Sequence, residues 1–142
     1  MKELANIRHW ICDLDNTLYS ATTHVFGKID KKMCEFIMQN LNVTRQEAVK
    51  IKNEYFHNHG TTLNGLMKKH DIDAHHFLEF VHDIDYEFLK KNPELNNQIK
   101  NLPGEKIIFT NGSKKHAERV IEKLGIEKNF QKIFDIVDCD FI

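Results

Sequence analysis

The chain has 142 residues, of which 41% are hydrophobic and 29% charged, and its formal net charge is −1 at pH 7. These values are typical of one globular domain, or of one core with an insertion. They give no support for a nucleic-acid or membrane partner. Residues 1–6 lack the apolar core of a signal peptide, and the three cysteines are scattered and fit no disulfide framework, so we expect a cytoplasmic protein.

The first predicted element is an apolar strand over residues 7–12, without alternation, as expected of a strand covered on both faces. Apolar residues then follow helical spacing through most of residues 20–91. Within that stretch Thr44 and Glu47 form a capping-box pattern, which predicts a helix start. Asp73 is a second expected N-cap.

The remainder of the chain alternates between helices and strands. A helix is expected to start at Pro93, because proline suits the first helical position. A second strand over residues 106–110 leads into a helix that Ser113 caps and that ends before Gly125. A third strand is expected over residues 133–137.

This order predicts an α/β fold with a parallel sheet, because strand–helix–strand units form right-handed crossovers. The expected core is discontinuous and comprises residues 1–19 and 92–142. Residues 20–91 are expected to form a helical cap inserted after the first strand.

Two carboxylates follow the first strand, at Asp13 and Asp15. Ligands of parallel sheets bind outside the carboxyl ends of the strands. Two acids so close repel each other unless they share a cation or a proton, and Mg²⁺ is the natural cation because it prefers oxygen ligands. For a bare Asp-x-Asp, an ordinary strand-to-turn junction is the alternative.

The second strand also ends in polar residues, Thr110, Asn111, Gly112 and Ser113. Gly112 allows a ligand to approach the backbone, and the helix that Ser113 caps offers free N–H groups to an anion. A capped loop without a ligand is the alternative. Together with the two acids on a neighbouring strand, the loop favours a phosphate site.

Both loops resemble known motifs. Asp13-Leu14-Asp15-Asn16-Thr17-Leu18-Tyr19 resembles the first signature motif of the haloacid dehalogenase-like (HAD) hydrolases, and Thr110-Asn111-Gly112-Ser113 resembles the second. More narrowly, the chain is similar to the pyrimidine 5′-nucleotidase branch. The matching stretches are 60–66, 81–86, 108–112 and 116–120.

The resemblance implies a HAD-like Rossmannoid core and a phosphohydrolase that works through an aspartyl-phosphate. Asp13 is then the nucleophile, and Asp15 protonates the leaving alcohol and later activates water. The Asp13 carboxylate and the Asp15 backbone carbonyl are expected to hold Mg²⁺. Thr110 and the N–H groups after it, at Asn111 and Gly112, are expected to bind phosphoryl oxygens.

In the same family the cap selects the substrate, here a small phosphorylated molecule such as a pyrimidine nucleoside monophosphate. Thr61, Thr62 and Asn64 are placed to reach the base or sugar, with helix capping as the alternative. His116, in the first turn after the phosphate loop, is expected either to approach the substrate or to be solvated.

The chain departs from the family after its third strand. Members of the family carry a third-motif lysine and a fourth-motif acidic pair, and residues 138–142 provide neither. We therefore expect weak activity, or a protein that keeps at most phosphate and Mg²⁺ binding. We also expect an exposed, apolar sheet edge at the first strand, which leads either to a homo-oligomer through that edge or to a compensating local rearrangement.

Overall fold

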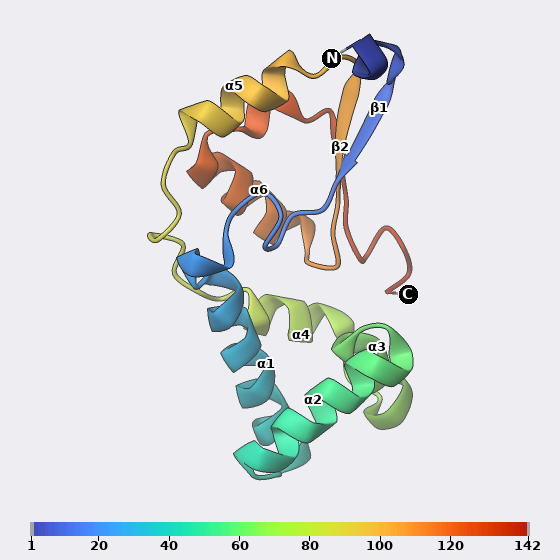
Figure 1. The fold of residues 1–142 in the computed structure, drawn as a ribbon. Coiled ribbons are helices and arrows are strands. Elements are labelled where there is room, and N and C mark those ends of the chain that lie inside the picture. The colour runs from blue at the N-terminus through green and yellow to red at the C-terminus, as the bar shows by residue number, and fades with distance from the viewer. Residues whose placement is uncertain (1, 142) are drawn as a thin grey trace.

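The computed structural model describes residues 2–141, in which three strands form one parallel sheet (Figure 1). In sheet order the strands are β1 (His9–Cys12), β2 (Glu105–Phe109) and β3 (Lys132–Phe134). The register pairs Cys12 with Ile108 and Phe109 with Phe134. The predicted α/β fold with a parallel sheet is therefore confirmed.

Helices connect and cover these strands. The α-helices are α1 (Val25–Leu41), α2 (Arg45–His59), α3 (Thr62–His70), α4 (Ala74–Val81), α5 (Pro93–Asn101) and α6 (Lys114–Leu124), and the 3₁₀ turns are η1 (Lys2–Asn6), η2 (Ala21–Thr23) and η3 (Glu127–Asn129). Between residues 2 and 141, no helix combines the length and the apolar composition needed to cross a bilayer.

The helices begin where local side chains satisfy free backbone groups. Thr44 and Glu47 form the predicted capping box at the start of α2, since each side chain accepts the other residue's backbone N–H. Asp73 starts α4 by accepting the N–H of His76 over 2.7 Å. Both predicted helix starts are confirmed.

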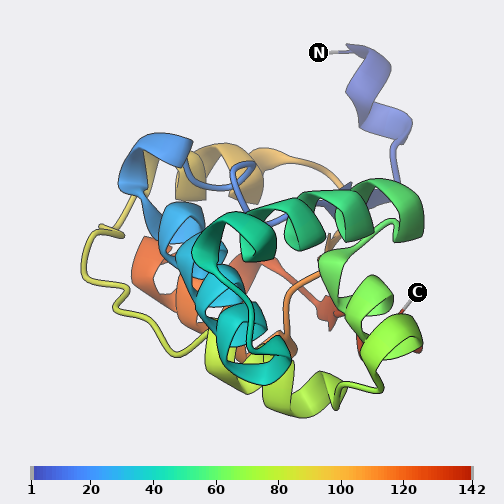
Figure 2. The same ribbon diagram turned by 90° about the horizontal axis from the view of Figure 1, so that it is seen from below.

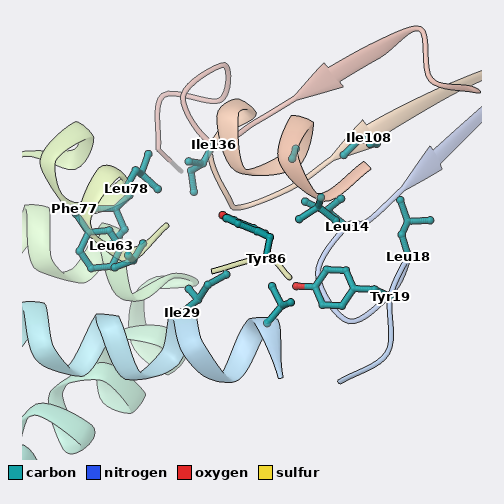
Figure 3. Packing of buried hydrophobic residues seen from close by; sticks show 14 of the residues in the cluster. Leu14, Leu18, Tyr19, Ile29, Leu63, Phe77, Leu78, Tyr86, Ile108 and Ile136 are labelled. Carbon is teal, nitrogen blue, oxygen red and sulfur yellow. The ribbon is translucent and has the colours of Figure 1, made fainter. Parts of the chain in front are cut away.

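Helices α5 and α6 lie beside the sheet, whereas α1 to α4 gather beyond the carboxyl ends of the strands (Figure 1). Figure 2 shows the molecule from the side of these four helices. One hydrophobic core joins the two groups: Leu14 and Ile108 at the strand ends belong to the same buried cluster as Ile29, Leu63 and Phe77 from the helices (Figure 3).

The division into a core and a cap at residues 20–91 stays a prediction. The last part of that segment packs against α6: the Tyr86 hydroxyl lies 2.8 Å from His116 Nδ1, and the ring of His82 stacks on that of His116. Residues 82–91 thus connect the two groups of helices.

The sheet is not covered in the way the sequence suggested. Ile108 on β2 is fully buried, but the next residue, Phe109, is 49% exposed, and Ile11 on β1 is 73% exposed. The expectation that the first strand is covered on both faces is therefore wrong for the described part of the chain. Trp10 Nε1, which is partly buried, donates to the Pro103 carbonyl over 2.7 Å and ties β1 to the segment before β2.

The third strand is also shorter than predicted. It was expected over residues 133–137, but β3 ends at Phe134. The buried carboxylate of Asp135 accepts the N–H groups of Val137 and Asp138 over 3.0 Å each, and that of Lys114 over 2.7 Å. These bonds turn the chain back toward the start of α6, so the strand cannot continue.

Candidate active site

The two strand tips that the sequence singled out lie side by side. Asp13 follows β1 and Thr110 follows β2, and these strands are parallel neighbours. Both residues line one cavity of about 390 Å³. Asp15, Asn111 and Gly112 line the same cavity, so the structure brings together all the residues predicted from the two motifs.

The turn after β1 leaves Asp13 accessible. Asn16 adopts a left-handed conformation with φ of 59°, which asparagine tolerates better than most residues, and the Leu14 carbonyl accepts the N–H of Thr17 and of Leu18. The Thr17 hydroxyl donates to Asp13 Oδ2 over 2.7 Å. Because Asp13 is exposed and Oδ1 receives no hydrogen bond from residues 2–141, that oxygen is open to a ligand.

The tip of β2 is suited to an anion. The buried hydroxyl of Thr110 accepts the N–H of Gly112 over 3.1 Å, so its own proton is free to be donated. A Cβ on Gly112 would lie 3.0 Å from His116 Cδ2 and 3.4 Å from Thr110 Oγ1, so a larger residue would displace its neighbours. Ser113 caps α6 directly behind this loop, and the helix N-terminus adds a partial positive charge.

A buried hydrogen-bonded chain surrounds Asp15. Its Oδ1 accepts the Tyr19 hydroxyl over 2.5 Å and is joined to His116 Nε2 over 2.8 Å. His116 is 1% exposed, and its other nitrogen, Nδ1, lies 2.8 Å from the Tyr86 hydroxyl. Both ring nitrogens of His116 are therefore occupied.

These contacts decide the charge of the carboxyl group. Burial on its own would raise the pKa of Asp15, but the hydrogen bond and charge of His116, with the bond from Tyr19, lower it below its ordinary value. Burial raises the pKa of Tyr19, and it raises that of Tyr86 to about 12 against the opposing effect of Arg119. Asp15 is thus ionised beside two neutral phenols.

His82 is a further buried histidine at this cavity. It lines the cavity, stacks on the ring of His116, and its Nδ1 lies 3.0 Å from the Ser113 hydroxyl. Burial and the neighbouring charge of His116 lower the pKa of His82 to about 3. His82 is therefore neutral at physiological pH.

The far wall of the cavity comes from α1 and α2. It carries two partly exposed phenyl rings, Phe26 and Phe56, and an ion pair in which Lys52 Nζ contacts the carboxylate of Asp30. Asn53 also lines this wall. The cavity is thus acidic and polar at the strand tips, and its helix side combines aromatic rings with an ion pair and an amide.

Of the three predicted substrate residues in the helical segment, two line the cavity and one does not. Thr61 and Thr62 line the cavity, but the Thr61 hydroxyl caps α3 and the Thr62 hydroxyl donates to the Lys52 carbonyl over 3.1 Å. The buried amide of Asn64 donates to the His59 carbonyl over 2.9 Å. The capping alternative is therefore confirmed for Thr61, and all three side chains already have protein partners.

Of the two positions expected for His116, the solvated one is wrong, and the approach to the substrate stays a prediction. His116 is buried and so not solvated, and its Nε2 contacts Asp15. Its neighbours Tyr19, His82 and Tyr86 were not singled out as functional residues. Sequence spacing could not reveal them, because the contact between Asp15 and His116 spans 101 positions. The one available signal was that all three lie in stretches that resemble the family.

The oxygen donors at the strand tips fit Mg²⁺. In the part of the chain that the structure describes, no three His, Cys, Asp or Glu residues are grouped to hold a metal ion. Mg²⁺, however, usually keeps several waters and binds one or two carboxylates together with substrate phosphate, and Asp13 provides an accessible carboxylate of that kind.

Comparison with known proteins finds a relative in yeast. No protein-family model matches the chain. The chain is 30% identical over 133 residues to Phosphate metabolism protein 8 of Saccharomyces cerevisiae. The alignment covers 85% of this chain but 41% of the yeast protein, so the chain spans less than half the length of this relative.

Proposed function

We propose that the chain acts as a Mg²⁺-dependent phosphohydrolase of the HAD-like type. The observation that carries the proposal is that Asp13, Asp15 and Thr110 line a single cavity at the ends of two adjacent parallel strands. The similarity to a yeast protein named for phosphate metabolism supports it. The resemblance of both loops to the HAD signature motifs supports it independently.

Asp13 is the proposed nucleophile because one of its oxygens is open to the cavity. That oxygen attacks phosphorus, a bond between Asp13 and phosphorus forms, and the bond from phosphorus to the leaving alcohol breaks. The Thr110 hydroxyl and the start of α6 donate to the phosphoryl oxygens. Bound Mg²⁺ would be held by the Asp13 carboxylate and the Asp15 backbone carbonyl, and it supplies charge neutralisation of the phosphoryl group.

Asp15 is the proposed proton carrier. In the first step it gives its proton to the leaving oxygen, and in the second it takes a proton from the water that releases phosphate from Asp13. The free carboxyl has a lowered pKa, but a bound phosphate dianion beside it disfavours the charged form. A halide leaving group would need no such proton, so Asp15 favours phosphate over halide chemistry.

A pyrimidine nucleoside monophosphate is the proposed substrate class. The cavity volume of about 390 Å³ lies within the range of small-molecule sites, roughly 300–1,000 Å³. Phe26 and Phe56 offer aromatic faces to a base, and Asn53 offers an amide. The resemblance of the chain to the pyrimidine 5′-nucleotidase branch favours the same class.

The test is phosphate release from p-nitrophenyl phosphate, UMP and CMP in the presence of Mg²⁺. Asp13→Asn keeps the shape but removes the nucleophile, so we expect turnover to fall at least about 10³-fold. Asp71→Asn is a matched control, because Asp71 ends α3 with φ of 52°, which asparagine tolerates. Equal rates for the wild type and Asp13→Asn would overturn the proposal.

The same experiment decides the alternative that the sequence left open. A protein that binds phosphate and Mg²⁺ without turnover would release no phosphate, yet its thermal unfolding midpoint would rise when both are added. That outcome would show that the protein binds phosphate and Mg²⁺ and is not a phosphohydrolase.

A further inference from the structure

Two hydrogen bonds meet on one oxygen of Asp15. The Tyr19 hydroxyl and His116 Nε2 both bond to Oδ1, over 2.5 and 2.8 Å. Oδ2 receives no hydrogen bond from residues 2–141, and Asp15 lines the cavity. The carboxyl is therefore held by one oxygen, and the other is left for a ligand.

His116 is itself held from several directions. Its Nδ1 lies 2.8 Å from the Tyr86 hydroxyl, which also donates to the His82 carbonyl over 3.2 Å. Its ring lies flat against that of His82, and it is 1% exposed. A side chain bound at both nitrogens and on one face has a single orientation, so His116 can impose an orientation on Asp15.

We infer that His116 is a positioning residue that, together with Tyr19, fixes Oδ1 of Asp15 so that Oδ2 faces the leaving oxygen of the substrate. The inference rests on the proposed phosphohydrolase function. In the first step the P–O bond to the leaving group breaks while the proton on Oδ2 moves to that oxygen. In the second step water loses a proton to the same Oδ2 as its oxygen bonds to phosphorus and the bond from phosphorus to Asp13 breaks.

A purely structural His116 would affect all substrates alike, but a positioning role makes the effect depend on the leaving group. The 5′-oxygen of a nucleotide leaves as an alcohol and needs a proton in the transition state. Nitrophenolate is stable as an anion at neutral pH and leaves without one. Misplacing Oδ2 should therefore slow the first step for UMP much more than for p-nitrophenyl phosphate.

The experiment compares single-turnover release of uridine and of nitrophenol by the wild type, His116→Leu and His116→Gln. General acid catalysis contributes about 10²–10⁴-fold, so for UMP we expect His116→Leu to lose roughly 10²-fold in the single-turnover rate constant, with the substrate concentration for half-maximal rate nearly unchanged. For nitrophenol release we expect a loss below about threefold. In His116→Gln the amide nitrogen takes the place of Nε2, so most of the lost rate should return.

Tyr19→Phe removes the second bond to Oδ1 and keeps the ring, which makes it the variant to use if His116→Leu does not fold. It should show the same dependence on the leaving group. Tyr55→Phe is the matched control, because its hydroxyl bonds to His70 at the end of α3 and neither residue lines the cavity, so it should change neither rate.

Equal losses for the two substrates, or a His116→Gln variant as slow as His116→Leu, would overturn the inference while leaving the phosphohydrolase intact. Asp13→Asn separates the two failures. If Asp13→Asn does not reduce the single-turnover release of uridine and nitrophenol, the proposed function is wrong, and the positioning role of His116 is then wrong as well.

Discussion

The imidazole rings of His82 and His116 are stacked, with their centroids 4.3 Å apart and their planes inclined by 7°. The two residues come from the end of α4 and from α6. Burial and the neighbouring charge of His116 both disfavour a proton on His82. This pair therefore makes the stability of the fold sensitive to acid.

The first prediction concerns that sensitivity. The pKa of His82 is lowered from 6.5 to about 3 in the folded protein, so between these values the unfolded chain binds the proton more tightly. The free energy of unfolding should therefore decrease as the pH falls below about 6.5, by up to about 1.4 kcal/mol per pH unit. Urea denaturation at pH 7, 6 and 5 measures this slope.

His82→Asn tests whether His82 causes the slope. Asparagine does not titrate and can keep a hydrogen bond to Ser113, so the decrease between pH 7 and 5 should be smaller than in the wild type. An unchanged slope in this variant would assign the acid sensitivity to another group.

The second prediction concerns the contact between α2 and α3. A Cβ on Gly65 would lie 2.4 Å from Tyr55 Cβ, so Gly65→Ala must push the helices apart, and we expect a loss of about 1–3 kcal/mol in unfolding free energy. Gly27→Ala on α1 is the control, because no atom lies within 4 Å of its added methyl group. It should stabilise the protein by about 0.5–1 kcal/mol. Similar effects of both changes in urea denaturation would contradict the packing argument.

The third prediction concerns Mg²⁺. Chelation should reduce phosphate release to the level of Asp13→Asn, and added Mg²⁺ should restore it. Ca²⁺ at the same concentration should restore little, because it prefers more oxygen ligands at longer distances. Full activity in the presence of a chelator would remove the metal from the proposed mechanism.

The fourth prediction concerns the aromatic wall of the cavity. Phe56 is 63% exposed and lines the cavity from α2, so it is available to stack on a base. Phe56→Ala should raise KM for UMP roughly tenfold, because stacking on an aromatic side chain is worth about 1–3 kcal/mol. KM for acetyl phosphate, which has no ring, should not change. An equal rise for both substrates would argue against a base at this wall.

The fifth prediction concerns self-association, which we propose for the β1 edge. Ile11 is 73% exposed on β1, one of the two edge strands of the described sheet, and apolar edge strands tend to pair with another chain. Sedimentation velocity should show a mass that rises with protein concentration, and Ile11→Lys should reduce this rise.

Val49→Lys is the control for that comparison, since Val49 is exposed on α2, away from the sheet. If the wild type keeps one mass at every concentration, or if both variants behave alike, the β1 edge is not an association surface.

Local signals explain what the sequence predicted well. The capping box of Thr44 and Glu47 and the cap at Asp73 involve partners three residues apart, so the pattern itself contains the interaction. The meeting of Asp13 with Thr110 was also predictable, because two parallel strands end at the same edge of a sheet.

Long-range contacts explain what the sequence missed. Nothing near Asp15 indicates that His116 lies 2.8 Å away, because that contact depends on how α6 packs against the β1 turn. The exposure of Ile11 was missed for a related reason: an apolar residue does not show whether another element covers it. The early end of β3 depends on Asp135, whose bond to Lys114 crosses between segments.

The bond from Trp10 to Pro103 gives the molecule an intrinsic optical probe. Trp10 is the only tryptophan in the chain, and its indole is anchored where the first strand meets the segment before the second. Its emission should therefore shift to longer wavelength when β1 detaches from its neighbour and the ring meets water. Opening of this part of the sheet can thus be followed in real time without any label.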